Sequence, residues 1–250
     1  MSLVSVQSAR VTAIEIAGGA MAKIRFQCDS RFRFEAGQFV SILVPTPQGF
    51  VKRLYSLANS PEHAKANGYE LCIKLVSGGK GSTFLCGLKP GDEFQFHAPY
   101  GHFEFHPRGR PVVFLGTGSG VAPLRSIVLS NRFQQAGIPF ALAVLGFRTK
   151  GEVPYWDEFE KVGVATRYAI SRENCEHPAT KRGRLTDVLR DMKSDFPWAD
   201  CDFYLCGNSD MIEEVRQFLA QKRVPKDAIF FESFSTPAVQ MPVEIERKVA

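Results

Sequence analysis

The sequence lacks the features that mark membrane, secreted and nucleic-acid-binding proteins. No apolar run approaches the roughly 18 residues that a membrane-spanning helix needs, and residues 1–10 mix polar and apolar side chains without a secretory signal pattern. The 31 lysines and arginines exceed the 26 acidic residues and give a net charge of +5, but they are spread along the chain. We therefore expect a cytoplasmic protein with no membrane span and no nucleic-acid partner.

Metal-binding and iron–sulfur signatures are missing as well. The six cysteines form no Cys-x-x-Cys pair, and the Cys201–Cys206 spacing, which would suit an iron–sulfur cluster, is not followed by a third cysteine. His102 and His106 are four residues apart, but they flank a strand-like segment and lack further ligands nearby. We expect no metal site, no built-in iron–sulfur module and, in a cytoplasmic chain, no disulfides.

The first 105 residues have the pattern of a β-structure. Of the 250 residues, 44% are hydrophobic, which is enough for two modest domains with buried cores. Short strand-like runs alternate with glycine, proline and asparagine, and one short helix is expected over 82–87. Many short strands with regular turns predict a closed antiparallel barrel. The expected strands are 4–16, 21–28, 38–44, 54–58, 69–76 and 93–98.

A segment rich in proline, glycine and charge, residues 106–111, separates this half from a different pattern. Beyond it, strands alternate with helices, which predicts an α/β doubly wound parallel sheet. We expect a β-barrel domain at 1–107 and an α/β domain at 108–250 that ends in a tail at 235–250. The expected strands are 112–116, 140–147, 165–170, 202–206 and 229–234, and the expected helices are 121–135, 155–161, 184–193 and 210–222.

A glycine-rich turn joins the first strand of the α/β half to its first helix. Three glycines follow the apolar run 112–115 at every second position, and a proline suits the first turn of the helix. Glycine lets backbone N–H groups approach a phosphate, and a helix N-terminus adds positive partial charge. Two interpretations stand: a dinucleotide phosphate loop, or a structural turn, because the spacing matches neither G-x-G-x-x-G nor a P-loop. The loop residues are Gly116, Thr117, Gly118, Ser119, Gly120 and Pro123.

Five short motifs stand in an order that resembles the ferredoxin–NADP reductase superfamily over residues 5–234. They are Arg53-Leu54-Tyr55-Ser56, Gly78-Gly79-Lys80-Gly81-Ser82-Thr83, Pro99-Tyr100-Gly101-His102-Phe103, the loop 116–123, and Cys206-Gly207-Asn208-Ser209-Asp210-Met211. The resemblance implies a flavoprotein oxidoreductase with an FAD-binding barrel and an NADP-binding sheet. It implies hydride transfer from NADPH to FAD, and electron transfer onward to ferredoxin or flavodoxin.

The resemblance also implies roles for residues of the barrel. Arg53 is expected on the FAD pyrophosphate, where a guanidinium matches two phosphate oxygens. Tyr55 is expected to lie flat on the flavin ring, and Ser56 to hydrogen-bond near flavin N5 as a catalytic residue. An ordinary strand and an ordinary helix cap are the structural alternatives for these segments. Further cofactor-site residues expected here are Leu54, Ile73, Lys74, Val76, Gly81, Ser82 and Thr83.

In the second half, the resemblance places Cys206 beside the nicotinamide as a catalytic residue that is not a nucleophile, with Gly207 and Met211 nearby. A buried small residue is the alternative for Cys206. Near the C-terminus, Phe234 is expected to shield the flavin and Glu232 to carry a proton. The tail 235–250 is either disordered or lies over the adenine half of FAD.

Basic residues after the third strand of the α/β half favour NADP(H) over NAD(H). The free 2′-hydroxyl of NAD usually meets a carboxylate, whereas the 2′-phosphate of NADP needs positive charge. Glu173 and Glu176 weaken this indication, because they add negative charge to the same segment. No tyrosine follows Lys181 to stack on the adenine ring. The residues assigned to the nucleotide are Arg148, Ser171, Arg172, Lys181 and Arg182.

Two other functions fit the same motifs. One is an NAD(P)H:flavin reductase that binds flavin only as a substrate. The other is the reductase or electron-transfer subunit of an oxygenase system that uses NADH. The sequence does not distinguish the electron acceptor, the direction of electron flow or the oligomeric state.

Overall fold

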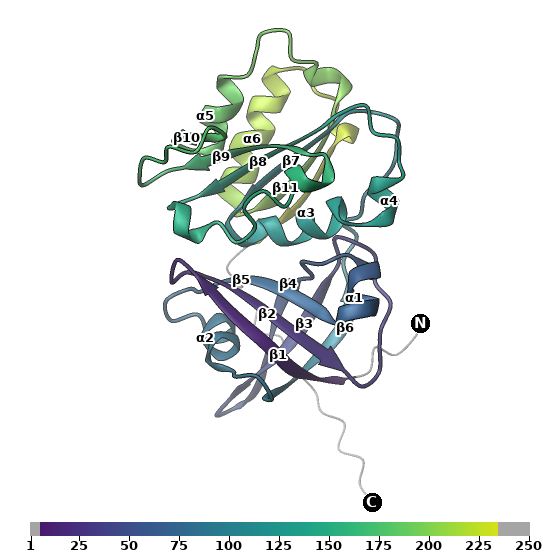
Figure 1. The fold of residues 1–250 in the computed structure, drawn as a ribbon, viewed down its shortest axis with the longest axis vertical. Coiled ribbons are helices and arrows are strands. Elements are labelled where there is room, and N and C mark those ends of the chain that lie inside the picture. The colour runs from purple at the N-terminus through teal and green to yellow at the C-terminus, as the bar shows by residue number, and fades with distance from the viewer. Residues whose placement is uncertain (1–5, 235–250) are drawn as a thin grey trace, which may run out of the picture.

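The first half of the chain forms a six-stranded antiparallel barrel in the computed structural model, which describes residues 6–234 (Figure 1). The strand order is β4-β3-β6-β1-β2-β5, and an isolated bridge between Leu57 and Leu71 joins the two edge strands. The expected barrel is therefore present. Its strands are β1 (Gln7–Ala17), β2 (Met21–Cys28), β3 (Phe39–Thr46), β4 (Gly49–Ser56), β5 (Tyr69–Lys74) and β6 (Glu93–Tyr100), and its helices are α1 (Pro61–Asn67) and α2 (Lys80–Gly87).

The barrel closes around an aromatic core, because alternate residues of each strand point inward. The ring of Phe26 lies 5.2 Å from that of Phe94 and 5.7 Å from that of Phe96, both edge-on. Edge-to-face pairs of this kind add to the stability gained from apolar burial. The core thus fixes β2 and β6, between which β1 runs.

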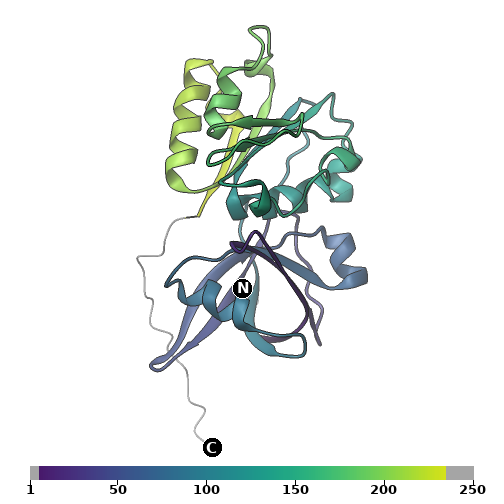
Figure 2. The same cartoon turned by 60° about the vertical axis from the view of Figure 1, so that its left-hand side comes forward.

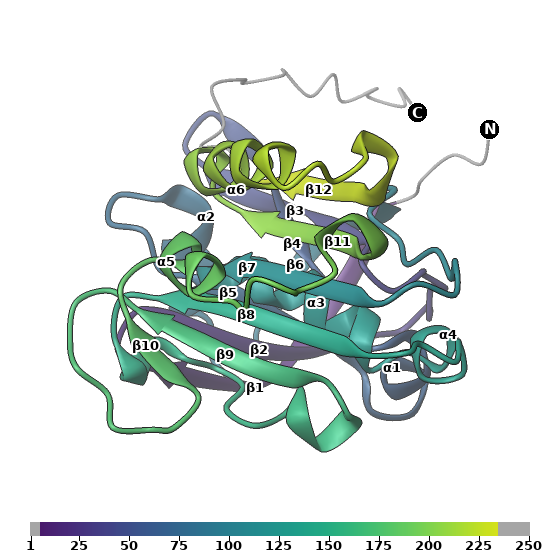
Figure 3. The same ribbon diagram turned by 90° about the horizontal axis from the view of Figure 1, so that it is seen from above.

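The second half forms a six-stranded parallel sheet in the order β10-β9-β8-β7-β11-β12, which Figure 3 shows side by side. The expected doubly wound sheet is therefore present. Its strands are β7 (Val112–Thr117), β8 (Ala141–Phe147), β9 (Ala165–Ile170), β10 (Thr180–Arg182), β11 (Asp202–Gly207) and β12 (Ile229–Ser233). Its α-helices are α3 (Val121–Val128), α4 (Asn131–Gln134), α5 (Leu185–Arg190) and α6 (Ser209–Gln221), with short 3₁₀ turns at Gly118–Gly120, Lys150–Glu152, Glu160–Val162, Trp198–Asp200 and Lys226–Ala228.

The strands of this sheet are buried on both faces, as continuous apolar runs predict. In β7, Phe114 packs into the cluster that contains α3 and α4, whereas Val113 and Leu115 pack into the cluster that contains α5 and α6. Helices therefore cover both faces. Among the described residues, no helix is long and apolar enough to cross a membrane.

Several expected element boundaries were wrong. Helix α1 was missed, although the side chain of Ser60 caps it by accepting from the N–H of His63. The helix expected at 121–135 breaks at Ser130, which caps α4. No α-helix forms at 155–161, because Asp157 adopts a left-handed backbone (φ 59°) and only a 3₁₀ turn follows. The tail 235–250 lies outside the described residues.

The two domains stack with α3 at their boundary (Figures 1 and 2). Ser126 Oγ donates to the carbonyl of Asn59 at 2.8 Å, which joins α3 to the barrel. The tip of the β1–β2 hairpin meets the α/β domain directly, since a methyl group on Gly18 would lie 2.5 Å from the backbone of Gly151. This stacking brings the end of β4 close to the ends of β11 and β12.

Candidate active site

Strand β4 and the first turn of α2 form a cradle in the barrel. Alternation along β4 turns Arg53 and Tyr55 toward α2, while Leu54 is 61% exposed on the other side. A methyl group on Gly81 would overlap the Tyr55 hydroxyl and lie 2.8 Å from Arg53 Cγ, so a larger residue there would displace both side chains. Within residues 6–234, no carboxylate lies within ion-pair distance of Arg53. Arg53 Nη1 donates to the carbonyl of Lys52 at 2.8 Å, so the guanidinium is oriented while its charge stays without a carboxylate partner. Beside the N–H groups of the first turn of α2, this cation suits a diphosphate.

The Tyr55 ring provides the apolar surface of this cradle. Burial raises the pKa of Tyr55 to about 12, so its phenol stays neutral. The Ser82 hydroxyl is occupied by the backbone of the preceding loop: it accepts from the N–H of Val76 at 3.1 Å. To bind the cofactor as predicted, the Ser82 hydroxyl would have to give up this hydrogen bond to the loop. Thr83 is exposed.

A carboxyl from the α/β domain reaches the end of β4. Ser56 Oγ donates to Glu232 Oε1 at 3.4 Å, across 176 residues of sequence. Burial raises the pKa of Glu232 to about 7, and the hydrogen bond from Ser56 acts in the opposite direction. Glu232 therefore changes protonation near neutral pH, in contact with the residue predicted to lie near flavin N5.

Cys206 pairs with Glu232 on one side and with Gly116 on the other, in register along β12 and β7. Its side chain is fully buried, and burial followed by the nearby Glu232 raises the pKa of the thiol well above its ordinary value. A neutral thiol is a poor nucleophile. The geometry agrees with a positioning role at the sheet edge and equally with a small buried residue, so the predicted role stays a prediction.

The glycine loop packs against the end of β11. The backbone of Gly118 is left-handed (φ 55°), and a methyl group on Gly120 would overlap the carbonyl of Cys206. Gly207 faces Thr117 and Met211 in the same way: its added methyl group would overlap Thr117 Oγ1 and lie 2.7 Å from Met211 Cε. The structure therefore brings the residues predicted at the nicotinamide into one cluster.

Thr117 Oγ1 is a buried oxygen without a hydrogen-bond partner among the described residues. Buried hydroxyls normally have partners, because an unmade hydrogen bond costs about 1–3 kcal/mol. The atom lies between β7 and β11, beside Gly207. An orphaned group at this position suits the amide of a nicotinamide, so the residues present fit the predicted ligand.

Positive charge continues from the glycine loop along the carboxyl ends of β8 and β9. A methyl group on Gly118 would lie 3.7 Å from Lys74 Cδ, so the side chain of Lys74, which belongs to the barrel, lies beside the glycine loop. Burial, together with Arg148 and Arg172, lowers the pKa of Lys74, while Glu152 opposes the shift. Mutual repulsion among close cations indicates a site that an anion would relieve.

These cations lead to an open pocket of about 640 Å³. Within residues 6–234, Arg148, Arg172 and Arg184 have no ion-pair partner, whereas Arg190 pairs with Asp187 at 2.9 Å. Three unneutralised guanidinium groups in one pocket can bind a phosphate through several charge-assisted hydrogen bonds. The lining residues are Arg148, Ser171, Arg172, Gly183, Arg184, Thr186, Asp187, Arg190 and Glu214.

Not every residue expected at the nucleotide lies in this pocket. Lys181 forms an ion pair with Asp191 and donates to the carbonyl of Asp187 at 3.1 Å, so its ammonium group is already occupied. Arg182 points to solvent, where it reaches Asn174 Oδ1 at 3.4 Å. In the barrel, Ile73 is fully buried in the core and has only its backbone to offer a cofactor. Phe234 donates its N–H to the carbonyl of Gly207 at 2.7 Å and is half-buried.

Lys181 and Arg182 were assigned to the nucleotide from the sequence, whereas the pocket is lined by Arg184 and Arg190. Arg184 precedes the short helix α5 and Arg190 is its last residue, and no sequence motif marks either of them. The one signal for Arg184 was its position, since the first turn of a helix after a parallel strand borders the ligand-binding edge.

A barrel with this cradle, joined to a parallel sheet with this glycine loop, defines a two-domain oxidoreductase that uses FAD and a nicotinamide dinucleotide. Family models agree: residues 8–105 match the oxidoreductase FAD-binding domain, and residues 114–217 match the oxidoreductase NAD-binding domain. The chain is 31% identical over 214 residues to ferredoxin–NADP reductase B of Sorangium cellulosum, covering 81% of this chain and 86% of that one. The chain belongs to the ferredoxin–NADP reductase family, as its motifs predicted.

Reductase components of oxygenases are similar too. The chain is 32% identical over 218 residues to the propane 2-monooxygenase reductase component of Mycolicibacterium goodii, covering 83% of this chain and 61% of that one. It therefore spans less than two thirds of that relative's length. The crystal structure of the Amycolatopsis cytochrome P450 reductase GcoB matches 92% of this chain and 70% of its own, with a TM-score of 0.79 and 27% identity.

Replacing Glu232 by glutamine should remove a pH dependence. With a carboxyl pKa of about 7, the carboxylate that can accept a proton becomes populated as the pH rises through neutrality. We expect NADPH-driven reduction of ferricyanide to increase through about pH 7 in the native protein, and to be at least about tenfold slower at pH 8 in E232Q, with no inflection. Rate profiles from pH 5 to 9 measure this. E213Q, on the exposed side of α6, should keep the native profile; an inflection that persists in E232Q would contradict the role.

Proposed function

We propose that this protein oxidises NADPH and passes the electrons to ferredoxin or flavodoxin, as a ferredoxin–NADP reductase with bound FAD. The single observation that supports this most is the contact between Ser56 and Glu232 beside Cys206. It joins the strand of the flavin cradle to the strands that hold the glycine loop, so the two ligands would meet there. When bound, FAD takes a hydride from the nicotinamide and releases electrons singly to the carrier.

The chain's own residues supply position, charge and a proton route. Arg53 and the first turn of α2 would hold the FAD diphosphate, and Tyr55 would cover the ring and exclude water. The glycine loop would hold the nucleotide's diphosphate, and Thr117 would fix the nicotinamide amide. Ser56 and Glu232 would exchange a proton with solvent at the reacting edge.

Charge in the pocket next to β8 and β9 supports NADPH over NADH. A 2′-phosphate there would neutralise Arg148, Arg172 and Arg184, which no described carboxylate does. The 2′-hydroxyl of NADH would leave them uncompensated. The net charge of +5 suits an acidic carrier protein as electron acceptor. The cytoplasmic location, which stays a prediction, suits the same partner.

The visible spectrum of the purified protein, followed by anaerobic stopped-flow reduction with each nucleotide, tests the proposal. We expect a yellow protein whose flavin is reduced faster and at lower concentration by NADPH than by NADH. A colourless protein that binds FMN and riboflavin as well as FAD would instead identify a flavin reductase. Reduction followed by electron transfer to purified ferredoxin or flavodoxin tests the acceptor.

The double variant R148Q/R172Q should lose the preference for NADPH. Each charge-assisted hydrogen bond to a phosphate contributes about 1.5–3 kcal/mol. We therefore expect kcat/KM for NADPH to fall at least about tenfold, while that for NADH changes less than about threefold. Steady-state kinetics with both nucleotides measure the change. R182Q is the matched control, because Arg182 lies outside the pocket. An unchanged NADPH-to-NADH ratio in the double variant would contradict the assignment.

A second candidate function is the reductase component of an oxygenase that uses NADH. The similarity to propane 2-monooxygenase reductase components supports it. It predicts equal or better reduction by NADH, and electron transfer to an oxygenase protein rather than to a free ferredoxin. The same stopped-flow comparison separates the two candidates.

A further inference from the structure

A second pocket lies on the face of the parallel sheet that α5 covers, away from the flavin cradle. Helix α5 has six residues, which is about 9 Å of helix, while β8 has seven residues, or about 23 Å of strand. The helix therefore leaves the first half of β8 uncovered. The resulting pocket has a volume of about 620 Å³, within the range of about 300–1,000 Å³ typical of small-molecule sites.

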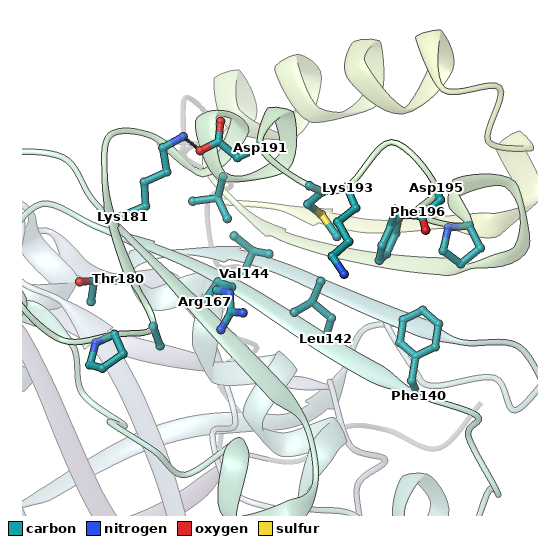
Figure 4. Close-up of a pocket in the computed structure, with 15 residues that line it drawn as sticks. Phe140, Leu142, Val144, Arg167, Thr180, Lys181, Asp191, Lys193, Asp195 and Phe196 are labelled. Carbon is teal, nitrogen blue, oxygen red and sulfur yellow. Dashed lines mark hydrogen bonds and ion pairs between the residues drawn. The ribbon is translucent and has the colours of Figure 1, made fainter.

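The pocket has an apolar floor and walls (Figure 4). Leu142 is half-buried and Phe140 is 38% exposed, whereas Val144, farther along β8, is fully buried. A hollow with a mainly apolar lining and a few polar groups is the usual form of a small-molecule site. The apolar lining consists of Phe140, Leu142, Val144, Pro178, Ala179, Val188, Met192, Phe196 and Pro197.

Two cations, each from an exposed residue, lie at the rim of this apolar space. Figure 4 shows the ammonium group of Lys193 and the guanidinium group of Arg167 directed into the region around Leu142. No carboxylate of residues 6–234 lies within ion-pair distance of either group; the one polar contact of Arg167 is with the carbonyl of Thr166, at 3.4 Å. The acidic residues of the lining do not neutralise them: Asp191 pairs with Lys181, and Asp195 forms no ion pair among the described residues.

We propose that this pocket binds a small amphipathic carboxylate, with its apolar tail over Phe140 and Leu142 and its anionic head between Arg167 and Lys193. Arg167 and Lys193 are exposed to water in the free protein, and an apolar body that covered them would remove that solvation without replacing it. A highly charged ligand such as a nucleotide would place polar groups on the apolar floor. A single carboxylate with a hydrocarbon tail satisfies both parts of the lining.

Helix α5 is a wall shared with the nucleotide pocket. Arg184, Thr186 and Asp187 line that pocket, whereas Val188 and Met192 line this one. A ligand that packs on Val188 and Met192 holds α5 where Arg184 reaches the nucleotide. The carboxylate and NADP⁺ should therefore each raise the affinity of the protein for the other, by the same factor. This coupling rests on the proposed function.

Calorimetric titration of the purified holoprotein with decanoate, below its micelle concentration, tests the site. We expect saturable binding, at least about tenfold weaker in R167Q/K193Q and for decyltrimethylammonium, which has the same tail and the opposite charge. M192W, which fills the pocket, should abolish binding. No binding to the native protein, equal binding by the double variant, or equal binding of decyltrimethylammonium would overturn the site.

Titration with NADP⁺ separates the coupling from the site. With decanoate at saturation, the Kd of NADP⁺ should fall at least about twofold, and M192W should show no change. Mutual exclusion of decanoate and NADP⁺ would overturn the site, because it would place decanoate in the nucleotide pocket. An unchanged Kd would overturn the coupling alone. Loss of NADP⁺ binding with decanoate binding intact would count against the proposed function and not against this pocket.

Discussion

Replacing Gly120 by alanine should lower the rate of flavin reduction by NADPH at least about a hundredfold, because misplacing reacting groups by about 1 Å has that effect. The backbone of Gly120 is right-handed helical (φ −60°), so alanine meets no conformational penalty there. The new methyl group would instead overlap the carbonyl of Cys206 and lie 2.9 Å from the nitrogen of Gly207. Those atoms are backbone, so either the glycine loop or the end of β11 must move.

The loss should be confined to the nucleotide side of the site. Arg53, Tyr55 and Gly81 belong to the barrel, so G120A should still be purified with FAD. Stopped-flow reduction gives the rate, and the visible spectrum gives the FAD content. G87A is the matched control: no atom of residues 6–234 lies within 4 Å of a methyl group there, and its kinetics should be native. A native reduction rate in G120A would show that the nicotinamide does not approach the end of β11.

Local patterns predicted the two-domain architecture and the central part of the site. Period-two alternation in β4 turned Arg53 and Tyr55 to one side, as observed. The continuous apolar run of β7 predicted a strand covered on both faces, and its clusters on either face confirm it. Sequence alone does not show why each position of the loop is glycine. Gly118 has a left-handed backbone, whereas Gly120 packs closely against the end of β11.

Features that depend on pairing between distant segments could not be predicted. Tyr155 and Phe159, four residues apart and apolar, gave helical spacing, yet both are buried without an α-helix between them. Lys181 and Arg182 are neighbours whose side chains leave β10 on opposite faces, and only the register with β9 determines which face meets the nucleotide pocket. The positive charge expected from Lys181 and Arg182 is supplied in this pocket by Arg184 and Arg190.

The contact between the domains is another feature that no local pattern marks. Glu70 of the barrel, whose side chain is 8% exposed, accepts from Tyr155 Oη at 2.8 Å and from Arg125 Nη1 at 3.2 Å. Arg125 also donates to the carbonyl of Ala58 and to Glu158, each at 2.7 Å. Burial raises the pKa of Tyr155 well above its ordinary value, so the phenol stays a donor. These contacts span 55 and 85 residues, and they tie the helix that follows the glycine loop to the barrel.

Replacing Arg125 by methionine should lower the free energy of unfolding by about 3 kcal/mol, because removing one partner of a buried ion pair leaves the other charge uncompensated. Chemical denaturation followed by circular dichroism measures the change. R10M is the matched control: Arg10 and Glu93 also form an ion pair, at 2.6 Å, but both are more than half exposed, so less than about 1 kcal/mol should be lost.

The double variant R125M/E70Q should lose less stability than the sum of its two single variants, since the second change removes the carboxylate that the first left unpaired. Additive losses, or a loss below about 1 kcal/mol in R125M, would show that Arg25, which lies 3.1 Å from Glu70, suffices to compensate it. Because α3 follows the glycine loop directly, R125M should also weaken NADPH binding while FAD content stays native. Loss of FAD instead would show that the contact supports the barrel and not the placement of the loop.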